Sequence, residues 1–317
     1  MTTPKFYSFA VAVFSVTALS RVPAAETILL DPVDAERERT VPVKVYLPET
    51  EKPLPVILFS HGLGGSRKAS PYLGNHWAEA GFVAVFIQHA GSDEDVWKNA
   101  ARSERMAAMK EAANFRSSVA RYADIPFVID QLEKWNVGEG HPLRGKLELE
   151  HIGMSGHSYG ANTTQAMMGQ KFPFNTDFHE PRIDAFLALS PSLHKRLTPE
   201  EAFGHVQSPV LLMTGTKDGS PIDPTTTPES RMQVFTALPK GDKYQLVLED
   251  AEHFAFSDAG GFSRQNRIEH HHHAIQTIST RFWNAYLKGD PDAKALLQSE
   301  AIRKEAELVE ADRWEWK

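Results

Sequence analysis

The chain has 317 residues, of which 41% are hydrophobic, so it can form either one large domain with a full core or two smaller domains. Its 34 basic and 41 acidic residues give a net charge of -7 and are not gathered into long runs of one sign, which argues against a nucleic-acid partner. Cysteine is absent, and this excludes disulfides, thiolate metal sites and a cysteine nucleophile.

The first 25 residues are typical of an export signal. Lys5 precedes an apolar stretch over residues 6–19, and small residues follow up to Ala24 and Ala25. The apolar stretch is shorter than the roughly 20 residues that a membrane-spanning helix needs. We therefore expect cleavage after Ala24 or Ala25, export to the periplasm or the medium, and a mature chain without an integral membrane span.

Residues 26–30 and 41–47 have the character of strands, and we expect them to open a sheet as antiparallel edge strands. Short apolar runs then alternate with longer helical stretches, at residues 56–59, 82–87, 152–154, 185–189, 210–213 and 244–248. Continuous apolar strands separated by helices predict a mostly parallel sheet with helices on both faces. No repeat or low-complexity linker divides the chain, so we predict a single α/β domain over residues 26–317.

Helices are predicted over residues 71–80, 95–135, 159–169, 230–237, 268–287 and 291–309, the last of them strongly charged. The stretch 91–120 is longer than a simple crossover between strands requires. Trp97, Met106, Met109 and Phe115 give it apolar character. It forms either a partial lid or an ordinary pair of packed surface helices.

The motif Gly156-His157-Ser158-Tyr159-Gly160 lies between a predicted strand and a predicted helix, the setting of a nucleophile elbow. In such an elbow the serine occupies a tight turn with strained backbone angles. The positions two before and two after it must be small so that strand and helix can pass each other. The motif therefore predicts Ser158 as a nucleophile, although the same pattern also occurs in plain turns.

The segment His61-Gly62-Leu63-Gly64-Gly65 directly follows the predicted strand 56–59. Acyl transfer builds negative charge on a carbonyl oxygen, and a backbone N–H aimed at that oxygen lowers the barrier by roughly 3 kcal/mol. One such donor comes from a loop of this kind and the other from the residue after the nucleophile. The expected oxyanion donors are the amides of Leu63 and Tyr159.

The general base must follow the elbow on a loop after a late strand, and His253 does so. The acid that orients it should lie at the end of the strand 210–213. Asp218 occupies that position, and Asp223 is the second candidate. The chain order serine, aspartate, histidine is the one used by a single class of serine hydrolases.

Four consecutive histidines, residues 270–273, lie at the start of a predicted helix. Two histidines one helical turn apart can bind a metal, but no nearby carboxylate pattern completes a catalytic zinc site. We expect a solvated helix start, no metal and no organic cofactor.

These segments make the chain similar to bacterial α/β-hydrolases of the group that contains platelet-activating-factor acetylhydrolases, dienelactone hydrolases and cutinase-like esterases. The resemblance covers most of the mature chain, and its carriers before the elbow, which are specific to the acetylhydrolase branch, are residues 60–65, 88–93, 121 and 124–132. The other carriers are residues 156–164, 214–218, 253–258 and 282–289. The resemblance implies the α/β-hydrolase fold and places nucleophile, acid and base on Ser158, Asp218 and His253, with Leu63 and Tyr159 as oxyanion donors.

The resemblance also implies an exported serine carboxylic-ester hydrolase that acts through an acyl-enzyme on short or medium acyl esters, with a small-molecule or lipid-like substrate. The missing cysteine argues against dienelactone hydrolysis, which needs a cysteine nucleophile, and weakens the comparison with disulfide-bearing polyesterases. A polyester or cutinase-like esterase and a lipase remain open alternatives. An amidase or peptidase and a non-catalytic binding protein of the same fold are further ones.

Overall fold

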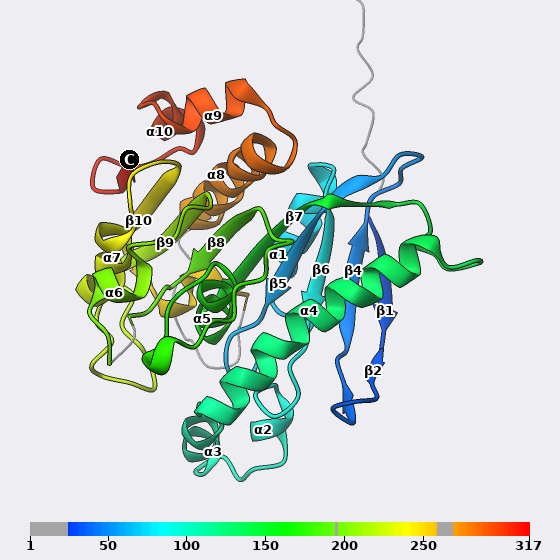
Figure 1. Ribbon diagram of the computed structural model, residues 1–317. Helices are drawn as coiled ribbons and strands as arrows, with labels where there is room; N and C mark the ends of the chain where they lie inside the picture. The colour runs from blue at the N-terminus through cyan, green and yellow to red at the C-terminus, as the bar shows by residue number, and fades with distance from the viewer. Residues whose placement is uncertain (1–24, 194–195, 259–268) are drawn as a thin grey trace, which may run out of the picture.

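A computed structural model describes residues 25–193, 196–258 and 269–317, so the expected export signal lies outside the described residues except for Ala25. At its centre is a nine-stranded sheet (Figure 1), whose strands in spatial order are β1 (Glu26–Leu30), β4 (Val43–Leu47), β6 (Val83–Ile87), β5 (Leu54–Ser60), β7 (Leu147–His157), β8 (Ala185–Leu189), β9 (Val210–Lys217), β10 (Lys243–Glu252) and β11 (Arg313–Trp316). A separate short hairpin pairs β2 (Val33–Asp34) with β3 (Arg39–Thr40).

The strands from β6 to β10 pair in parallel, whereas β1, β4 and β11 pair antiparallel. The predicted mostly parallel sheet is thus confirmed, and so are the antiparallel strands at the N-terminal edge. The ninth strand, β11, was not predicted; it adds to the opposite edge beside β10.

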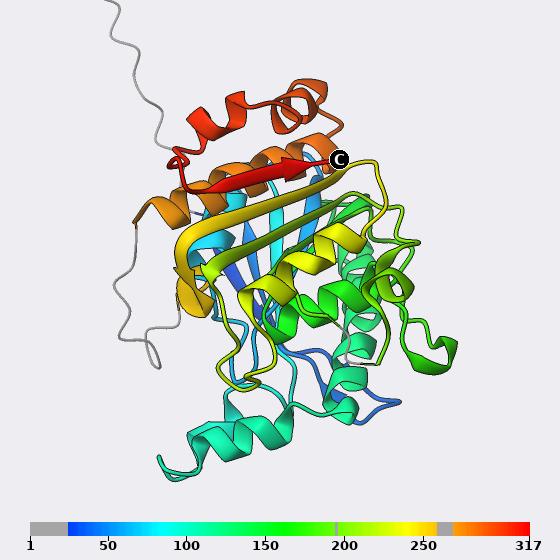
Figure 2. The same cartoon turned by 90° about the vertical axis from the view of Figure 1, so that its left-hand side faces the viewer.

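Helices cover both faces of the sheet because successive residues of the central strands point to opposite sides. In β5, Val56 and Leu58 pack on one face, and Ile57 and Phe59 pack on the other. Figures 1 and 2 show the two layers, one formed by α4 (Phe115–Val137), α5 (Tyr159–Met167), α6 (Pro199–Phe203) and α7 (Pro228–Ala237), the other by α1 (Pro71–Glu79), α8 (Glu269–Leu287), α9 (Pro291–Leu297) and α10 (Ala301–Glu305).

The predicted helix over residues 291–309 is wrong, because the chain forms two short helices there, α9 and α10. Their buried side chains are Ala293 and Leu297 in α9, and Ile302 with Ala306 in and after α10. On one straight helix the five-residue step from Leu297 to Ile302 would turn the second pair by roughly 140° from the first. The break lets both pairs face the same core.

The stretch 91–120 contains α2 (Asp95–Lys98), α3 (Arg105–Ala112) and the first residues of α4. Helices α2 and α3 extend from one end of the sheet rather than covering a face (Figure 2). Trp97 docks this segment onto the glycine-rich loop, since its Nε1–H donates to the Gly64 carbonyl at 2.7 Å. Whether the segment moves as a lid stays a prediction.

Candidate active site

Ser158 lies at the sharp turn between β7 and α5, with φ 57° and ψ -113°. A β-carbon at Gly160 would lie 1.8 Å from the Ser60 carbonyl oxygen, and one at Gly156 would lie 2.3 Å from the Gly160 carbonyl oxygen. Both distances are far below van der Waals contact. The requirement for very small residues two positions either side of the serine is therefore met in the structure.

The structure brings Ser158, Asp218 and His253 together from the ends of three strands, since each directly follows the last residue of β7, β9 or β10. His253 Nε2 lies 2.8 Å from Ser158 Oγ, and its Nδ1 lies 2.7 Å from Asp218 Oδ1. Asp218 is fully buried and His253 is nearly so. Because a carboxylate can only accept, the Nδ1 atom carries the proton and Nε2 faces the serine hydroxyl as an acceptor.

Asp218 follows the last residue of β9, as the sequence predicted. Its Oδ2 accepts a hydrogen bond from Thr214 Oγ1 at 2.9 Å. Burial raises the pKa of Asp218, but the hydrogen bond and charge of His253 and the nearby Arg231 cation outweigh burial and lower the pKa of this carboxyl. The second candidate, Asp223, accepts hydrogen bonds from Thr225 and Thr226 in its own loop.

Neither the Leu63 nor the Tyr159 backbone N–H has a protein acceptor among the described residues. Leu63 lies in a turn that Gly65 N closes by donating to the Gly62 carbonyl at 3.0 Å, while Tyr159 begins α5. Leu63 and Ser158 line the same pocket. The role of these two amides as oxyanion donors stays a prediction.

His157 and Arg231 also touch the site, and sequence reasoning did not single them out. His157 Nε2 donates to the His253 carbonyl at 2.9 Å, and the two rings lie 4.9 Å apart. Burial, followed by the neighbouring His253, lowers the pKa of His157 to about 3, so this ring is neutral. Its place inside the elbow motif was the only sequence signal for it.

Arg231, on α7, is 1% exposed and donates to main-chain oxygens around the acid. Its Nε donates to the Asp218 carbonyl at 2.7 Å, and its Nη1 donates to the Ser190 and Pro191 carbonyls. The same Nε lies 3.1 Å from Asp218 Oδ1. Nothing in a helical stretch marks one arginine for this role, because the contacts arise only when α7 packs beside the ends of β8 and β9.

A pocket of about 570 Å³ opens onto Ser158 and His253. Its walls are mainly apolar and include Trp97, Met106 and Met109 from the α2–α3 segment. The volume falls in the range of small-molecule sites, roughly 300–1,000 Å³. The pocket therefore suits a ligand with an apolar part placed next to the serine.

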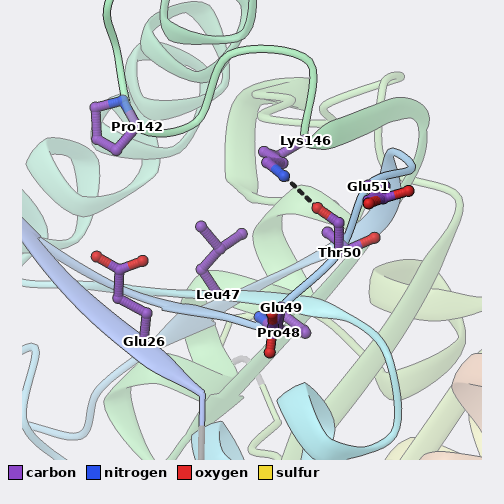
Figure 3. Close-up of a pocket in the computed structure, with 8 residues that line it drawn as sticks. All are labelled: Glu26, Leu47, Pro48, Glu49, Thr50, Glu51, Pro142 and Lys146. Atoms are coloured by element: carbon purple, nitrogen blue, oxygen red, sulfur yellow. Dashed lines mark hydrogen bonds between the residues drawn. The ribbon is translucent and has the colours of Figure 1, made fainter. Parts of the chain in front are cut away.

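A second hollow, of about 670 Å³, lies away from the site beside the loop that follows β4 (Figure 3). Glu26, Glu49 and Glu51 contribute carboxylates to it, and Lys146 donates a hydrogen bond to the Thr50 carbonyl. It contains none of the residues predicted to take part in catalysis.

The solvated helix start that was expected is wrong for His271, which is buried, whereas His270, His272 and His273 are partly exposed. His271 is 2% exposed, its Nε2 lies 2.9 Å from the Glu249 carbonyl, and His272 stacks on Tyr72 at 3.8 Å. His271 and His272 face the protein because their Nε2 atoms bind carbonyls of the chain segment that carries His253, those of Glu249 and Ala255. Within residues 25–193, 196–258 and 269–317, no cluster of three or more histidine and acidic side chains could hold a metal ion.

No helix in the described ranges combines the length and apolar character needed to cross a bilayer.

Comparison with known proteins supports the fold and the resemblance. The family model of platelet-activating factor acetylhydrolase, isoform II, matches residues 29–121. A ferulic acid esterase from Streptomyces cinnamoneus has a similar structure, with a TM-score of 0.65 and 18% sequence identity over 94% of this chain and 98% of its own. No curated protein matches the sequence. The chain thus has the α/β-hydrolase fold, and its similarity to the platelet-activating-factor acetylhydrolases is confirmed over residues 29–121.

Proposed function

We propose that the protein is a serine esterase that hydrolyses carboxylic esters of short or medium acyl chain length through an acyl-enzyme. The observation that carries this proposal is the continuous hydrogen-bonded series from Ser158 through His253 to Asp218, the first two of which line an apolar pocket. A serine hydroxyl is a weak nucleophile until a base removes its proton, and here the base is within hydrogen-bonding distance and held in the required tautomer.

The reaction runs in two halves. His253 Nε2 takes the proton of Ser158 as its oxygen attacks the ester carbonyl, and the negative oxygen that forms is bound by the Leu63 and Tyr159 amides. His253 then gives the proton to the leaving alcohol, which leaves an acyl group on the serine. A water molecule, deprotonated by the same histidine, releases the acid and restores the enzyme. Asp218 stabilises the imidazolium formed in each half.

The similar proteins suggest which esters to test. The matched family is named for an acetyl ester of a lipid, and the structural neighbour is named for a ferulic acid ester. We propose a substrate with an acyl group small enough for the pocket at Ser158. A panel should contain p-nitrophenyl acetate, butyrate and octanoate, platelet-activating factor, methyl ferulate and a p-nitroanilide.

The test is hydrolysis of this panel by the wild-type protein and by Ser158→Ala. We expect ester hydrolysis by the wild type, little anilide hydrolysis, and a loss of about 10⁴-fold or more in kcat for the folded variant. A fluorophosphonate should label one serine, identified as Ser158 by peptide mass spectrometry. Labelling of another serine, or full activity in Ser158→Ala, would refute the assignment.

We further propose that the enzyme is exported and matures by cleavage after Ala24 or Ala25. The support is the basic start, apolar stretch and small residues of the first 25 positions. Expression of the full chain in a bacterial host, followed by intact-mass measurement of the protein from the periplasm and the medium, tests this. A product in those fractions that retains residues 1–25, or confinement to the cytoplasm, would contradict it.

A further inference from the structure

Arg121, on α4, is a fully buried cation close to the candidate site. All its hydrogen bonds go to uncharged acceptors. Nε donates to Thr163 Oγ1 at 3.0 Å, Nη1 to Ser92 Oγ at 3.0 Å, and Nη2 to Ser60 Oγ at 2.9 Å and to the His61 carbonyl. No carboxylate in the described ranges lies within ion-pair distance of its guanidinium. A buried charge is costly, so its retention needs a reason.

The guanidinium touches both chain segments that supply the proposed oxyanion donors. Its Nη2 binds the carbonyl of His61, two residues before Leu63. Its Cζ also lies over the Tyr159 ring, 4.7 Å from the ring centroid. Its Nε partner, Thr163 Oγ1, in turn donates to the Tyr159 carbonyl at 3.2 Å. One rigid, planar group therefore spans the glycine-rich loop and the first turn of α5.

Arg121 is held by a series of hydrogen bonds in which the donor and the acceptor of each bond can be assigned. The Asp124 carboxylate can only accept, so His89 carries its proton on Nδ1 and donates it to Asp124 Oδ2 at 2.9 Å. The Nε2 atom of the neutral ring must then accept the Ser60 hydroxyl proton at 3.0 Å, and Ser60 Oγ in turn accepts from Arg121, which can only donate. The series begins at a buried cation and ends at a buried carboxylate.

The protonation states fit this direction. Burial, and next the Arg121 cation, lower the pKa of His89 to about 4, so the ring is neutral at neutral pH. Burial raises the pKa of Asp124, but hydrogen bonds from His89 and Arg39 outweigh it and lower that pKa to about 2. Ser60, His89 and Asp124 repeat the residue types of the candidate triad, but all are fully buried, which leaves no room for a substrate.

We propose that Arg121 is a positioning residue that sets the distance and orientation between the Leu63 and Tyr159 amides, with Ser60, His89 and Asp124 fixing the guanidinium. The inference rests on the proposed esterase function and on these two amides as oxyanion donors. Arg121 does not touch the substrate; it acts through the two segments that it holds.

The test of this role compares each ester with its thiono analogue, in which sulfur replaces the carbonyl oxygen. Sulfur accepts hydrogen bonds weakly, so an aligned oxyanion hole favours the oxygen ester. A misaligned hole should slow the oxygen ester selectively. For Arg121→Lys we expect kcat for the oxygen ester to fall about 10- to 100-fold with little change in KM, since loss of one donor costs about 10²–10³-fold. The oxygen-to-thiono ratio of kcat/KM should fall with it.

A purely structural role would lower the folded fraction and slow both esters equally, which leaves that ratio unchanged. Arg182→Lys is the matched control, because Arg182 is a half-buried arginine that pairs with Glu180, Asp130 and Glu133 away from the site. It should retain the wild-type rates and ratio.

The nearly isosteric variant Thr163→Val keeps the test decisive if Arg121→Lys does not fold. It removes the acceptor of Arg121 Nε, and the oxygen-to-thiono ratio should fall, whereas Thr163→Ser should restore it. A wild-type protein inactive toward both esters would overturn the proposed function together with this inference. An active wild type that prefers the oxygen ester, beside folded variants with the same preference, would overturn the inference alone.

Discussion

Replacement of Asp218 by asparagine removes one negative charge beside His253 and keeps the shape of the side chain. Two orientations are available to the amide. If its nitrogen faced His253, it would also point at Arg231 Nε, which lies 3.1 Å from the present Oδ1 and is itself a donor. If its oxygen faces His253, the nitrogen meets Thr214 Oγ1, whose hydroxyl can turn to accept. We therefore expect the second orientation.

This orientation determines how far kcat should fall in Asp218→Asn. With the amide oxygen toward Nδ1, His253 keeps the tautomer that accepts the proton of Ser158, but the imidazolium loses its counter-charge. Two unit charges about 4 Å apart attract by about 4 kcal/mol at an effective dielectric constant near 20. That corresponds to about 10³-fold in kcat. The loss should be smaller than the roughly 10⁴-fold found in a serine protease where the amide imposes the wrong tautomer.

The assay is kcat for p-nitrophenyl butyrate at 25 °C, normalised by fluorophosphonate titration of active sites and accompanied by a thermal unfolding curve. Asp223→Asn is the control, because Asp223 binds threonines of its own loop and should retain kcat within about threefold. A folded Asp218→Asn enzyme within tenfold of wild type, or a larger loss in Asp223→Asn, would refute the assignment of the acid.

Gly160→Ala should lower the unfolding free energy by about 3 kcal/mol or more in urea titrations, because its β-carbon would overlap the Ser60 carbonyl; an unchanged urea midpoint would contradict this contact. Trp97→Ala should raise KM about tenfold for p-nitrophenyl octanoate and little for the acetate, because the longer acyl chain would lose roughly 1.4 kcal/mol of apolar contact with the indole. Equal effects on both esters would show that Trp97 does not contact the acyl chain. Lowering the pH from 7 to 5 should lower the unfolding free energy by about 2 kcal/mol for each of His89 and His157. Their lowered pKa values of about 4 and 3 keep both rings neutral in the fold, whereas the same histidines in the unfolded chain take up protons below about pH 6.5. Equal urea midpoints at both pH values would contradict their burial as neutral rings.

The parts of the site that could be predicted depend on local sequence order. The elbow needs a serine flanked by glycines two positions away at a strand-to-helix turn, so five consecutive residues are enough to recognise it. Asp218 and His253 could be placed because each follows an apolar strand, and the carboxyl ends of parallel strands lie at one edge of the sheet.

The parts that were missed depend on packing between distant segments. Arg121 shares α4 with Arg116 and was marked only as a carrier of the resemblance, and Arg231 is the single arginine of α7. Only the assembled layers show that both side chains reach the strand ends. β11 carried a weak local signal, because Trp314 and Trp316 alternate with charged residues in the manner of an edge strand. The run of four histidines was misjudged in part, because polar side chains at a helix start are usually solvated, whereas here His271 and His272 bind the Glu249 and Ala255 carbonyls.

The buried polar groups around the site share one physical cause. Where parallel strands end, the chain turns away from its neighbours and main-chain carbonyls lose their partners in the sheet, although burial still requires a donor for each. Side chains supply these donors: Arg121 to His61, Arg231 to Ser190, Pro191 and Asp218, His157 to His253, and His271 to Glu249. The His61, Asp218, Glu249 and His253 carbonyls lie within four residues of a group proposed to act in catalysis, and the Ser190 and Pro191 carbonyls share Arg231 with Asp218. The same bonds that make the strand ends stable therefore set the positions of the nucleophile's partners, so that loss of a buried donor should reduce kcat as well as the unfolding free energy.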